Sequence, residues 1–277
     1  MSQDTTLTPS ATGPALALAQ SHSTPHPLKL YGSWFCPFVQ RVWIVLEEKA
    51  IPYQYIEINP YHKSPSFLAL NPRGLVPTLA VPATGSQQLK PLYESTVLCE
   101  YLDEAFPDDG YGRLLPDDVY ERARCRLWAD HVSSRVVPGF YRLLQYNGDS
   151  EGRNKMRHEF LKSIKSLARE MSGDGGPWFM GERFGLVDVM LVPWARRLWL
   201  IDHYKVGGVG IPKKGEREED EEVWARWETW YKAAEERKSV SDTWSEDAEY
   251  IKAYQRYADD TTQSEVGQAT RQGRSLP

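Results

Sequence analysis

Cys36 is the residue of this sequence whose position most favours nucleophilic chemistry. It follows a short apolar run at residues 28–32 and directly precedes Pro37, the expected first residue of a helix with one apolar face. A thiol at a helix N-terminus lies beside free backbone N–H groups and the positive end of the helix dipole, which lower its pKa and favour the thiolate. The sequence therefore predicts a reactive thiol at Cys36.

The other two cysteines lack such a setting. Cys99 lies in an apolar helical run and Cys125 lies among three arginines of another expected helix, so we expect both to pack as small apolar residues. Position 39 is valine, and Cys36 therefore cannot close an internal disulfide in a Cys-x-x-Cys motif. A mixed disulfide at Cys36 has to be resolved by an external thiol. This pattern predicts a monothiol enzyme with a small thiol co-substrate.

The elements expected to position Cys36 follow the order β-α-β-α-β-β-α. Strands are predicted at residues 28–32, 53–58, 76–81 and 89–93, and helices from 37, around 66–70 and at 94–106. The later pattern is helical, at 119–144 with a kink at Pro138, and at 154–171, 184–201 and 223–231. We expect a disordered tail (1–27), an α/β domain (28–106), a linker (107–118), an all-helical domain (119–250) and a polar tail (251–277).

Composition excludes several classes of function. The 277 residues, 41% hydrophobic and 26% charged, suit two ordinary soluble domains, and the net charge of −5 argues against nucleic acid as a partner. Three cysteines without framework spacing favour a reducing, cytoplasmic compartment. No apolar run approaches the ~18 residues of a membrane span, and no basic region precedes the short apolar patch at 15–19, so neither stable membrane association nor a secretory signal is expected. Zinc-ligand spacing is missing, so no metal is expected.

Three short motifs resemble one known family. They are Phe-Cys-Pro-Phe at residues 35–38, Asn-Pro-x-Gly-x-Val-Pro at 71–77, and the pair Glu94-Ser95. Together they resemble an omega-class glutathione transferase of the fungal type, over residues 28–244. The resemblance implies a thioredoxin-like N-terminal domain that binds glutathione, an all-helical C-terminal domain that supplies the acceptor site, and a homodimer.

The resemblance assigns glutathione binding to Phe38, Lys63, Val76, Pro77, Glu94 and Ser95. In the family the proline is cis, and the Val76 backbone would pair with the cysteinyl part of glutathione. Ser95 at a helix N-terminus suits the γ-glutamyl carboxylate, and Glu94 suits the ammonium group. Lys63 lies thirteen residues before Val76, the family's spacing for a lysine that reaches the glycyl carboxylate.

In the second domain the resemblance assigns the acceptor site to Arg124, Trp128, His131 and Trp230. The residues around Val187 and Asp188 resemble the start of the family's core helix, where the cap is usually Ser or Thr. This chain has Gly185 at that position. Glycine caps a helix at a cost of only a few tenths of a kcal/mol, so we expect the helix to form.

These features predict a glutathione-dependent thiol transferase and reductase with a role in detoxification. Cys36 would take glutathione from a small disulfide or electrophilic substrate and return it to a second glutathione, in deglutathionylation or dehydroascorbate-type reduction. Two alternatives stay open. One is a non-catalytic carrier that holds apolar ligands in an aromatic cleft. The other follows from residues 36–41, which also resemble the membrane-inserting chloride intracellular channel family.

Overall fold

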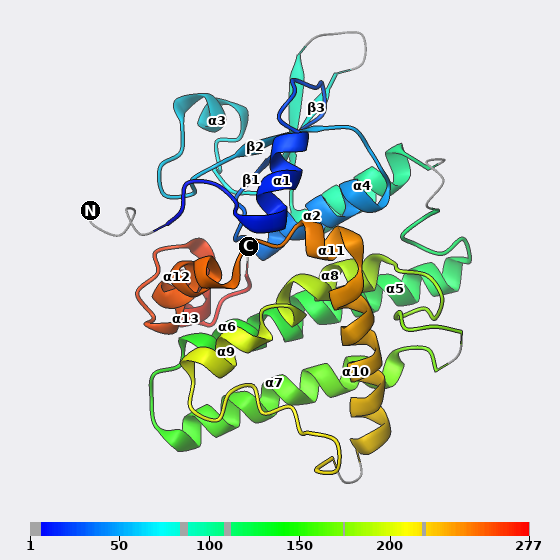
Figure 1. Ribbon diagram of the computed structural model, residues 1–277, viewed down its shortest axis with the longest axis vertical. Coiled ribbons are helices and arrows are strands. Elements are labelled where there is room, and N and C mark those ends of the chain that lie inside the picture. Colours follow the sequence, from blue (N-terminus) through cyan, green and yellow to red (C-terminus); the bar gives the residue numbers. More distant parts are fainter. Residues whose placement is uncertain (1–6, 84–87, 108–111, 174, 218–219, 277) are drawn as a thin grey trace. The chain divides into compact units, whose positions relative to one another are not determined.

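The computed structural model describes residues 7–83, 88–107, 112–173, 175–217 and 220–276 (Figure 1). The chain divides into two compact units. Unit 1 combines the chain up to Leu114 with Arg237–Ala253, and unit 2 combines Leu115–Glu236 with the chain from Tyr254 onward. The first boundary falls within the linker predicted at 107–118, of which 108–111 lie outside the described residues.

Unit 1 contains a four-stranded sheet in the order β2-β1-β3-β4 (Figure 1). β1 pairs with β2 in parallel and with β3 in antiparallel register, and β3 pairs with β4 in antiparallel register. The elements are β1 (Lys29–Gly32), α2 (Pro37–Glu48), β2 (Gln54–Glu57), α3 (Pro65–Leu70), β3 (Thr78–Pro82), β4 (Leu89–Tyr93) and α4 (Ser95–Ala105). The predicted order β-α-β-α-β-β-α, which is the thioredoxin-like arrangement, is confirmed.

Residues 237–253 belong to unit 1 and pack on α2. Most of these residues were predicted to belong to the helical domain (119–250). α11 (Lys238–Asp242) packs on α2, and the Gln40 amide of α2 donates to Thr243 Oγ1 at 3.2 Å. The Arg237 guanidinium binds the carboxylate of Glu48, with a distance of 2.7 Å between Nε and Oε1. These contacts explain why Gln40, on the polar side of the helix in the sequence pattern, is only 1% exposed.

The predicted disordered tail (1–27) contains α1 (Gly13–Ser21), so the prediction of disorder was wrong for that segment. The predicted polar tail (251–277) contains the end of α12 (Asp247–Ala258) and all of α13 (Glu265–Gln272). In unit 1, Ala15 is completely buried and its N–H donates to the Trp244 carbonyl at 3.2 Å. In unit 2, Gln145 Nε2 donates to Asp260 Oδ1 at 2.8 Å, just before α13. The partners lie more than 100 residues away in the sequence, where local composition gives no sign of them.

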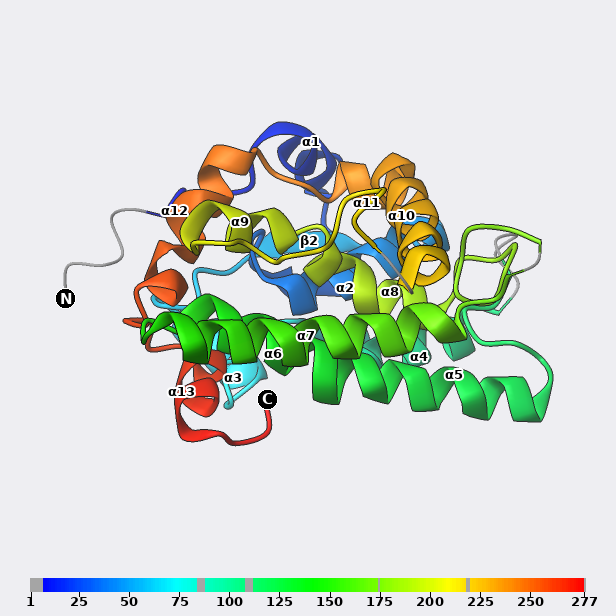
Figure 2. The same cartoon turned by 90° about the horizontal axis from the view of Figure 1, so that it is seen from below.

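Unit 2 is all-helical, as predicted. Its elements are α5 (Val119–His131), the π-helical segment η2 (Val132–Val136), α6 (Val137–Gln145), α7 (Ser150–Glu170), α8 (Leu186–Ala195), α9 (Leu198–Tyr204), α10 (Glu221–Glu236) and α13. The kink predicted at Pro138 takes the form of η2, which ends two residues before the proline and accommodates its missing N–H. Figure 2 shows α7 running alongside α6, against which it packs.

α8 forms the centre of unit 2 and is buried along its whole length. It begins after Gly185, so the predicted glycine cap is confirmed. The Asp188 carboxylate accepts from Gly185 N–H and from Phe179 N–H, each at 2.9 Å. Among the residues that the structure describes, no helix has the length and apolarity that crossing a membrane requires.

Candidate active site

Cys36 occupies the N-cap position of α2, as the sequence predicts. Its backbone is extended (φ −78°, ψ 119°), its N–H donates to Ser33 O at 2.9 Å, and its carbonyl accepts from Gln40 N–H at 3.1 Å. The side chain is partly exposed. The thiol therefore lies at the positive end of the helix dipole and remains open to a reaction partner.

The other cysteines are buried, as predicted. Cys99 is 0% and Cys125 1% exposed, and neither forms a disulfide. Burial raises the pKa of the Cys99 thiol to about 12 and that of Cys125 to about 11. At neutral pH both are thiols rather than thiolates, so Cys36 is the cysteine fitted for nucleophilic attack.

The loop at residues 71–77 lies next to the thiol. Cys36 Sγ is 3.9 Å from the Val76 carbonyl oxygen, and the Val76–Pro77 peptide is cis, as the resemblance implies. The buried Asn71 amide holds the loop by donating to Leu75 O at 3.2 Å and to Thr78 Oγ1 at 2.8 Å. The backbone of this loop therefore passes beside the Cys36 thiol.

Ser95 and Glu94 stand at the start of α4. Ser95 is its first residue, and Glu94 precedes it with a left-handed φ of 72°. Ser95 Oγ accepts from Arg41 Nη1 of α2 at 3.2 Å, and Arg41 Cζ lies 5.5 Å from the ring centroid of Phe38. One buried guanidinium thus connects two of the predicted glutathione residues.

Arg73 also belongs to this region, although the sequence argument did not single it out. Its Nη1 donates to Glu94 Oε1 at 2.6 Å, and its guanidinium lies 5.2 Å from the ring centroid of Tyr93. Lys63 lies across the same loop, because a Cβ atom on Gly74 would be 3.1 Å from Lys63 Nζ. Arg73 could have been noticed as a cation inside the motif at 71–77, whereas Arg41 looked like part of an ordinary helix face.

The predicted acceptor residues lie in unit 2, three of them on α5. The Arg124 guanidinium donates to Glu170 O at 2.6 Å and lies 5.1 Å from the ring centroid of Phe179. His131 Nε2 is 2.9 Å from Ser163 O, and the ring centroids of Trp128 and His131 are 4.9 Å apart. The structure therefore brings these three side chains onto one side of α5.

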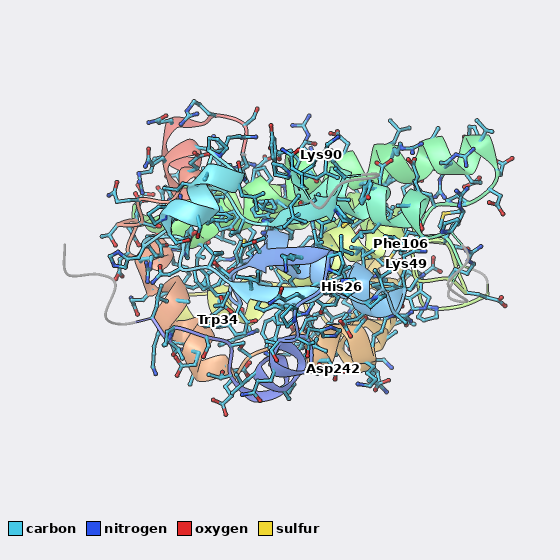
Figure 3. All side chains as sticks on the ribbon, turned by 90° about the horizontal axis from the view of Figure 1, so that it is seen from above. His26, Trp34, Lys49, Lys90, Phe106 and Asp242 are labelled. Atoms are coloured by element: carbon cyan, nitrogen blue, oxygen red, sulfur yellow. The ribbon has the colours of Figure 1, made fainter. Side chains whose placement is uncertain are left out.

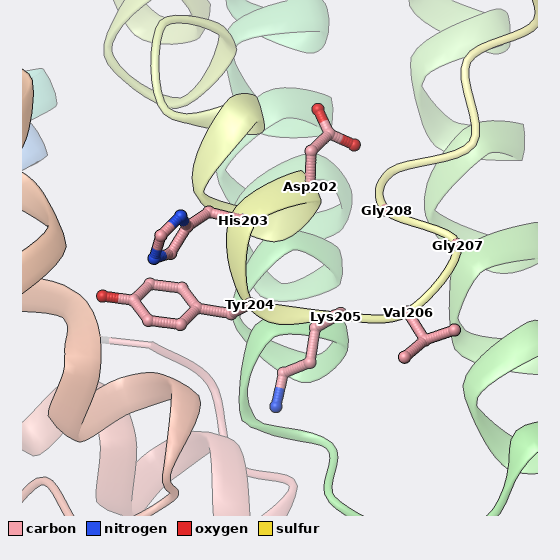
Figure 4. A pocket seen from close by; sticks show the side chains of 7 residues that line it. All are labelled: Asp202, His203, Tyr204, Lys205, Val206, Gly207 and Gly208. Carbon is pink, nitrogen blue, oxygen red and sulfur yellow. The ribbon is translucent and has the colours of Figure 1, made fainter.

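Trp230 of α10 has different surroundings. It is 0% exposed, and its indole N–H donates to Asp188 Oδ1 at 2.7 Å, so Trp230 supports the start of α8. A separate pocket of about 440 Å³ follows α9 and is lined by residues 202–208 (Figure 4). It contains none of the four predicted acceptor residues, whose role in binding stays a prediction.

Comparison with known proteins identifies the family. The model of the glutathione S-transferase N-terminal domain matches residues 35–105, and that of the C-terminal domain matches 150–233. Glutathione transferase Omega 3C from Trametes versicolor is 39% identical, with a TM-score of 0.76 over 92% of this chain and 100% of that one. Glutathione S-transferase omega-1 from Sus scrofa is 34% identical over 67% of this chain and 75% of its own length.

A plant structure shares the fold as well. Rice GST1, solved in complex with glutathione, is 27% identical, with a TM-score of 0.68 over 85% of this chain and 97% of that one. The chain belongs to the omega class of the glutathione S-transferase family. It is thus a glutathione transferase, for which glutathione is the co-substrate and electrophiles are the acceptors. Within the described ranges, no three His, Cys, Asp or Glu side chains gather to hold a metal ion.

Proposed function

We propose that this transferase acts as a thiol transferase and reductase through a mixed disulfide at Cys36. The observation that carries the proposal is the partly exposed thiol at the N-cap of α2, with valine at position 39 and both other cysteines buried. A Cys-x-x-Cys enzyme resolves its mixed disulfide internally. Here the resolving thiol has to come from glutathione.

The chemistry balances as two thiol–disulfide exchanges. In the first, the Cys36 thiolate attacks the glutathione sulfur of a mixed disulfide, and the former partner leaves as a thiolate that takes up a proton. In the second, a glutathione thiolate attacks the glutathione sulfur on Cys36, releasing glutathione disulfide and restoring the Cys36 thiolate. Reduction of dehydroascorbate uses the same final step and consumes two glutathione molecules for each two-electron reduction.

The surroundings of Cys36 suit the charges of glutathione. The Val76 backbone would pair with its cysteinyl part, and Ser95 with the α4 N-terminus would bind the γ-glutamyl carboxylate. Glu94 would bind the ammonium group, and Lys63 the glycyl carboxylate. In unit 2, we propose that Arg124, Trp128 and His131 of α5 contact the acceptor. Trp230 would support the site by holding the start of α8 through Asp188.

The test is mass spectrometry of the purified protein after incubation with glutathione disulfide. We expect one adduct of about 305 Da on Cys36, removed by added glutathione, because one exposed thiol exchanges once. A Cys125→Ala variant serves as the control and should give the same single adduct. An adduct at Cys99 or Cys125 in place of Cys36, or no adduct at all, would contradict the proposal.

We also propose that the protein works as a homodimer in a reducing, cytoplasmic compartment. Unit 1 exposes several large apolar side chains, among them Tyr93 (40%) and Val97 (54%), and association would remove such apolar area from water. Three free thiols suit a reducing environment. Analytical ultracentrifugation should show a dimer that Val97→Glu shifts towards monomer, and a monomeric wild type would refute the assembly.

A further inference from the structure

The turn that presents Cys36 is fastened to the end of β2. Ile58 N–H donates to Gly32 O at 2.6 Å, and the Ser33 hydroxyl donates to Ile58 O. The third contact is the backbone N–H of Trp34, which donates to Glu57 Oε1 at 3.0 Å. Of these contacts, the one to Glu57 involves a group that can gain or lose a proton.

Glu57 has unusual surroundings for a carboxyl group. Its second oxygen, Oε2, is 3.1 Å from the hydroxyl of Tyr55, and in the described part of the chain no Lys, Arg or His forms an ion pair with it. Burial raises the pKa of Glu57 to about 8, although the bonds from Trp34 and Tyr55 act in the opposite direction. Glu57 keeps some exposure to solvent, but a largely desolvated carboxyl without a cation is costly, and groups with shifted pKa values cluster at functional sites.

Tyr55 connects Glu57 with the active-site helix. Its ring stacks on Trp43 of α2, with 4.4 Å between the ring centroids, and it is 7% exposed. Burial raises the pKa of Tyr55 well above its usual value, and negative charges on Glu57 and on Cys36 add to the effect. The hydroxyl of Tyr55 is therefore within electrostatic reach of both the carboxyl and the thiol.

The other side of Glu57 faces a cavity of about 10 Å³ within unit 1. It is lined by residues 7–9, 34, 35 and 57–60, and Trp34 (labelled in Figure 3) closes it by donating its indole N–H to Thr8 O at 3.1 Å. The cavity is about the smallest that can hold a water molecule, which would give the carboxyl a route for proton exchange.

Few other ionisable groups face this cluster. Residues 7–9 and 58–60 contribute none, β2 contributes Tyr55, the residue before β2 contributes Tyr53, and the N-cap of α2 contributes Cys36. From α12, Glu249 accepts from the Thr8 hydroxyl, and the ring of Tyr250 packs edge-on against Trp34 with 5.3 Å between the ring centroids.

We propose that Glu57 is a positioning residue for Cys36: it fixes the Ser33–Cys36 turn through the Trp34 N–H, and its protonation state changes the reactivity of the thiol. A carboxylate holds an N–H more strongly than a neutral acid does. It also places a negative charge near the thiolate, which the neutral acid avoids. The proposal rests on the proposed function in one respect only, the role of Cys36 as nucleophile.

The test measures the rate at which iodoacetamide alkylates Cys36 between pH 5 and 10, site by site with mass spectrometry. For Glu57→Ala, which removes the acceptor of the Trp34 N–H, we expect alkylation at pH 7 to slow by about tenfold, because small misplacements of a reacting group are costly. Glu57→Gln keeps an acceptor but cannot ionise. The first change in rate follows the ionisation of the Cys36 thiol itself. The wild type should show a second change near pH 8, where Glu57 ionises, and Glu57→Gln should lack it.

Glu47→Gln is the matched control, because Glu47 Oε1 accepts from the hydroxyl of Tyr53, the residue before β2, at 2.7 Å, and no hydrogen bond joins Glu47 to the turn in the described residues. Its pH profile should equal that of the wild type. If Glu57→Ala does not fold, the profile of Glu57→Gln decides. A wild-type profile in Glu57→Gln, or an unchanged rate in Glu57→Ala, overturns the proposal. Alkylation needs no glutathione, so the outcome is independent of whether Cys36 exchanges with glutathione disulfide.

Discussion

The two units carry their predicted functional residues in different ways. In unit 1, Cys36 lies at a helix start with a partly exposed thiol, and the glutathione residues lie at helix starts and in the loops before α3 and β3. Two of them have internal partners: Glu94 binds Arg73 at the surface, and the buried Ser95 binds Arg41. In unit 2, the residues assigned to the acceptor are already occupied: Arg124 and His131 bind backbone carbonyls of α7, and Trp230 binds Asp188. From this contrast we predict that the thiol of unit 1 can react without rearrangement, whereas the assigned residues of unit 2 have to release internal contacts before they can bind a ligand.

The largest expected effect concerns the chemistry of unit 1. Cys36→Ser should lower the rate of mixed-disulfide reduction by on the order of 10³-fold, because a hydroxyl at this position is a far weaker nucleophile than a thiolate. Turnover with a glutathione mixed disulfide measures the effect. Cys99→Ala, at a buried thiol, should retain activity. If Cys36→Ser retained the wild-type rate, the mixed-disulfide mechanism would be excluded.

The next effect tests whether Asp188 of unit 2 is structural. It accepts from the N–H groups of Gly185, Phe179 and the Trp230 indole, so Asp188→Ala leaves three buried donors without their acceptor. We expect the free energy of unfolding to fall by about 3–5 kcal/mol, measured by urea denaturation.

A matched control for that change is Asp247→Ala in unit 1, which removes one bond from an indole, that of Trp244 at 2.9 Å. A part-buried single bond should cost only about 1 kcal/mol. Equal losses for the two variants would contradict the central structural role of Asp188.

A third prediction concerns the pH dependence of stability in unit 1. The raised pKa of Glu57, about 8 compared with 4.5 in the unfolded chain, means that the folded protein binds more protons between these values. Stability should therefore fall as pH rises through this window. Glu57→Gln removes this dependence and should gain about 2–3 kcal/mol on the wild type between pH 6 and 9. Urea denaturation at several pH values measures it, and parallel curves for the two proteins would refute the prediction.

The sequence predicted unit 1 better because its signals are local. A proline after Cys36, the motif at 71–77 and the start of α4 each constrain the backbone where they stand, and the structure confirms those positions. The burial of Gln40 and the packing of α1 both depend on residues 237–253, which are distant in the sequence but belong to unit 1. The surroundings of Trp230 depend likewise on how α8 and α10 pack, which spacing alone does not reveal. Arg73 was missed because its partner, Glu94, lies 21 residues away.

The smallest expected effect tests how far the site of unit 1 is preformed. Arg73 holds Glu94 at 2.6 Å, but the two side chains are 46% and 44% exposed, and such pairs contribute little to stability. Arg73→Ala should raise the KM for glutathione by about two- to fivefold and leave kcat and the unfolding curve nearly unchanged, because the loss is of orientation and of one positive charge. Arg73→Lys should recover part of the affinity by restoring the charge without the planar guanidinium. A lower KM in Arg73→Ala would instead mean that Arg73 competes with the ammonium group of glutathione for Glu94, and that unit 1, like unit 2, must open an internal contact before it binds.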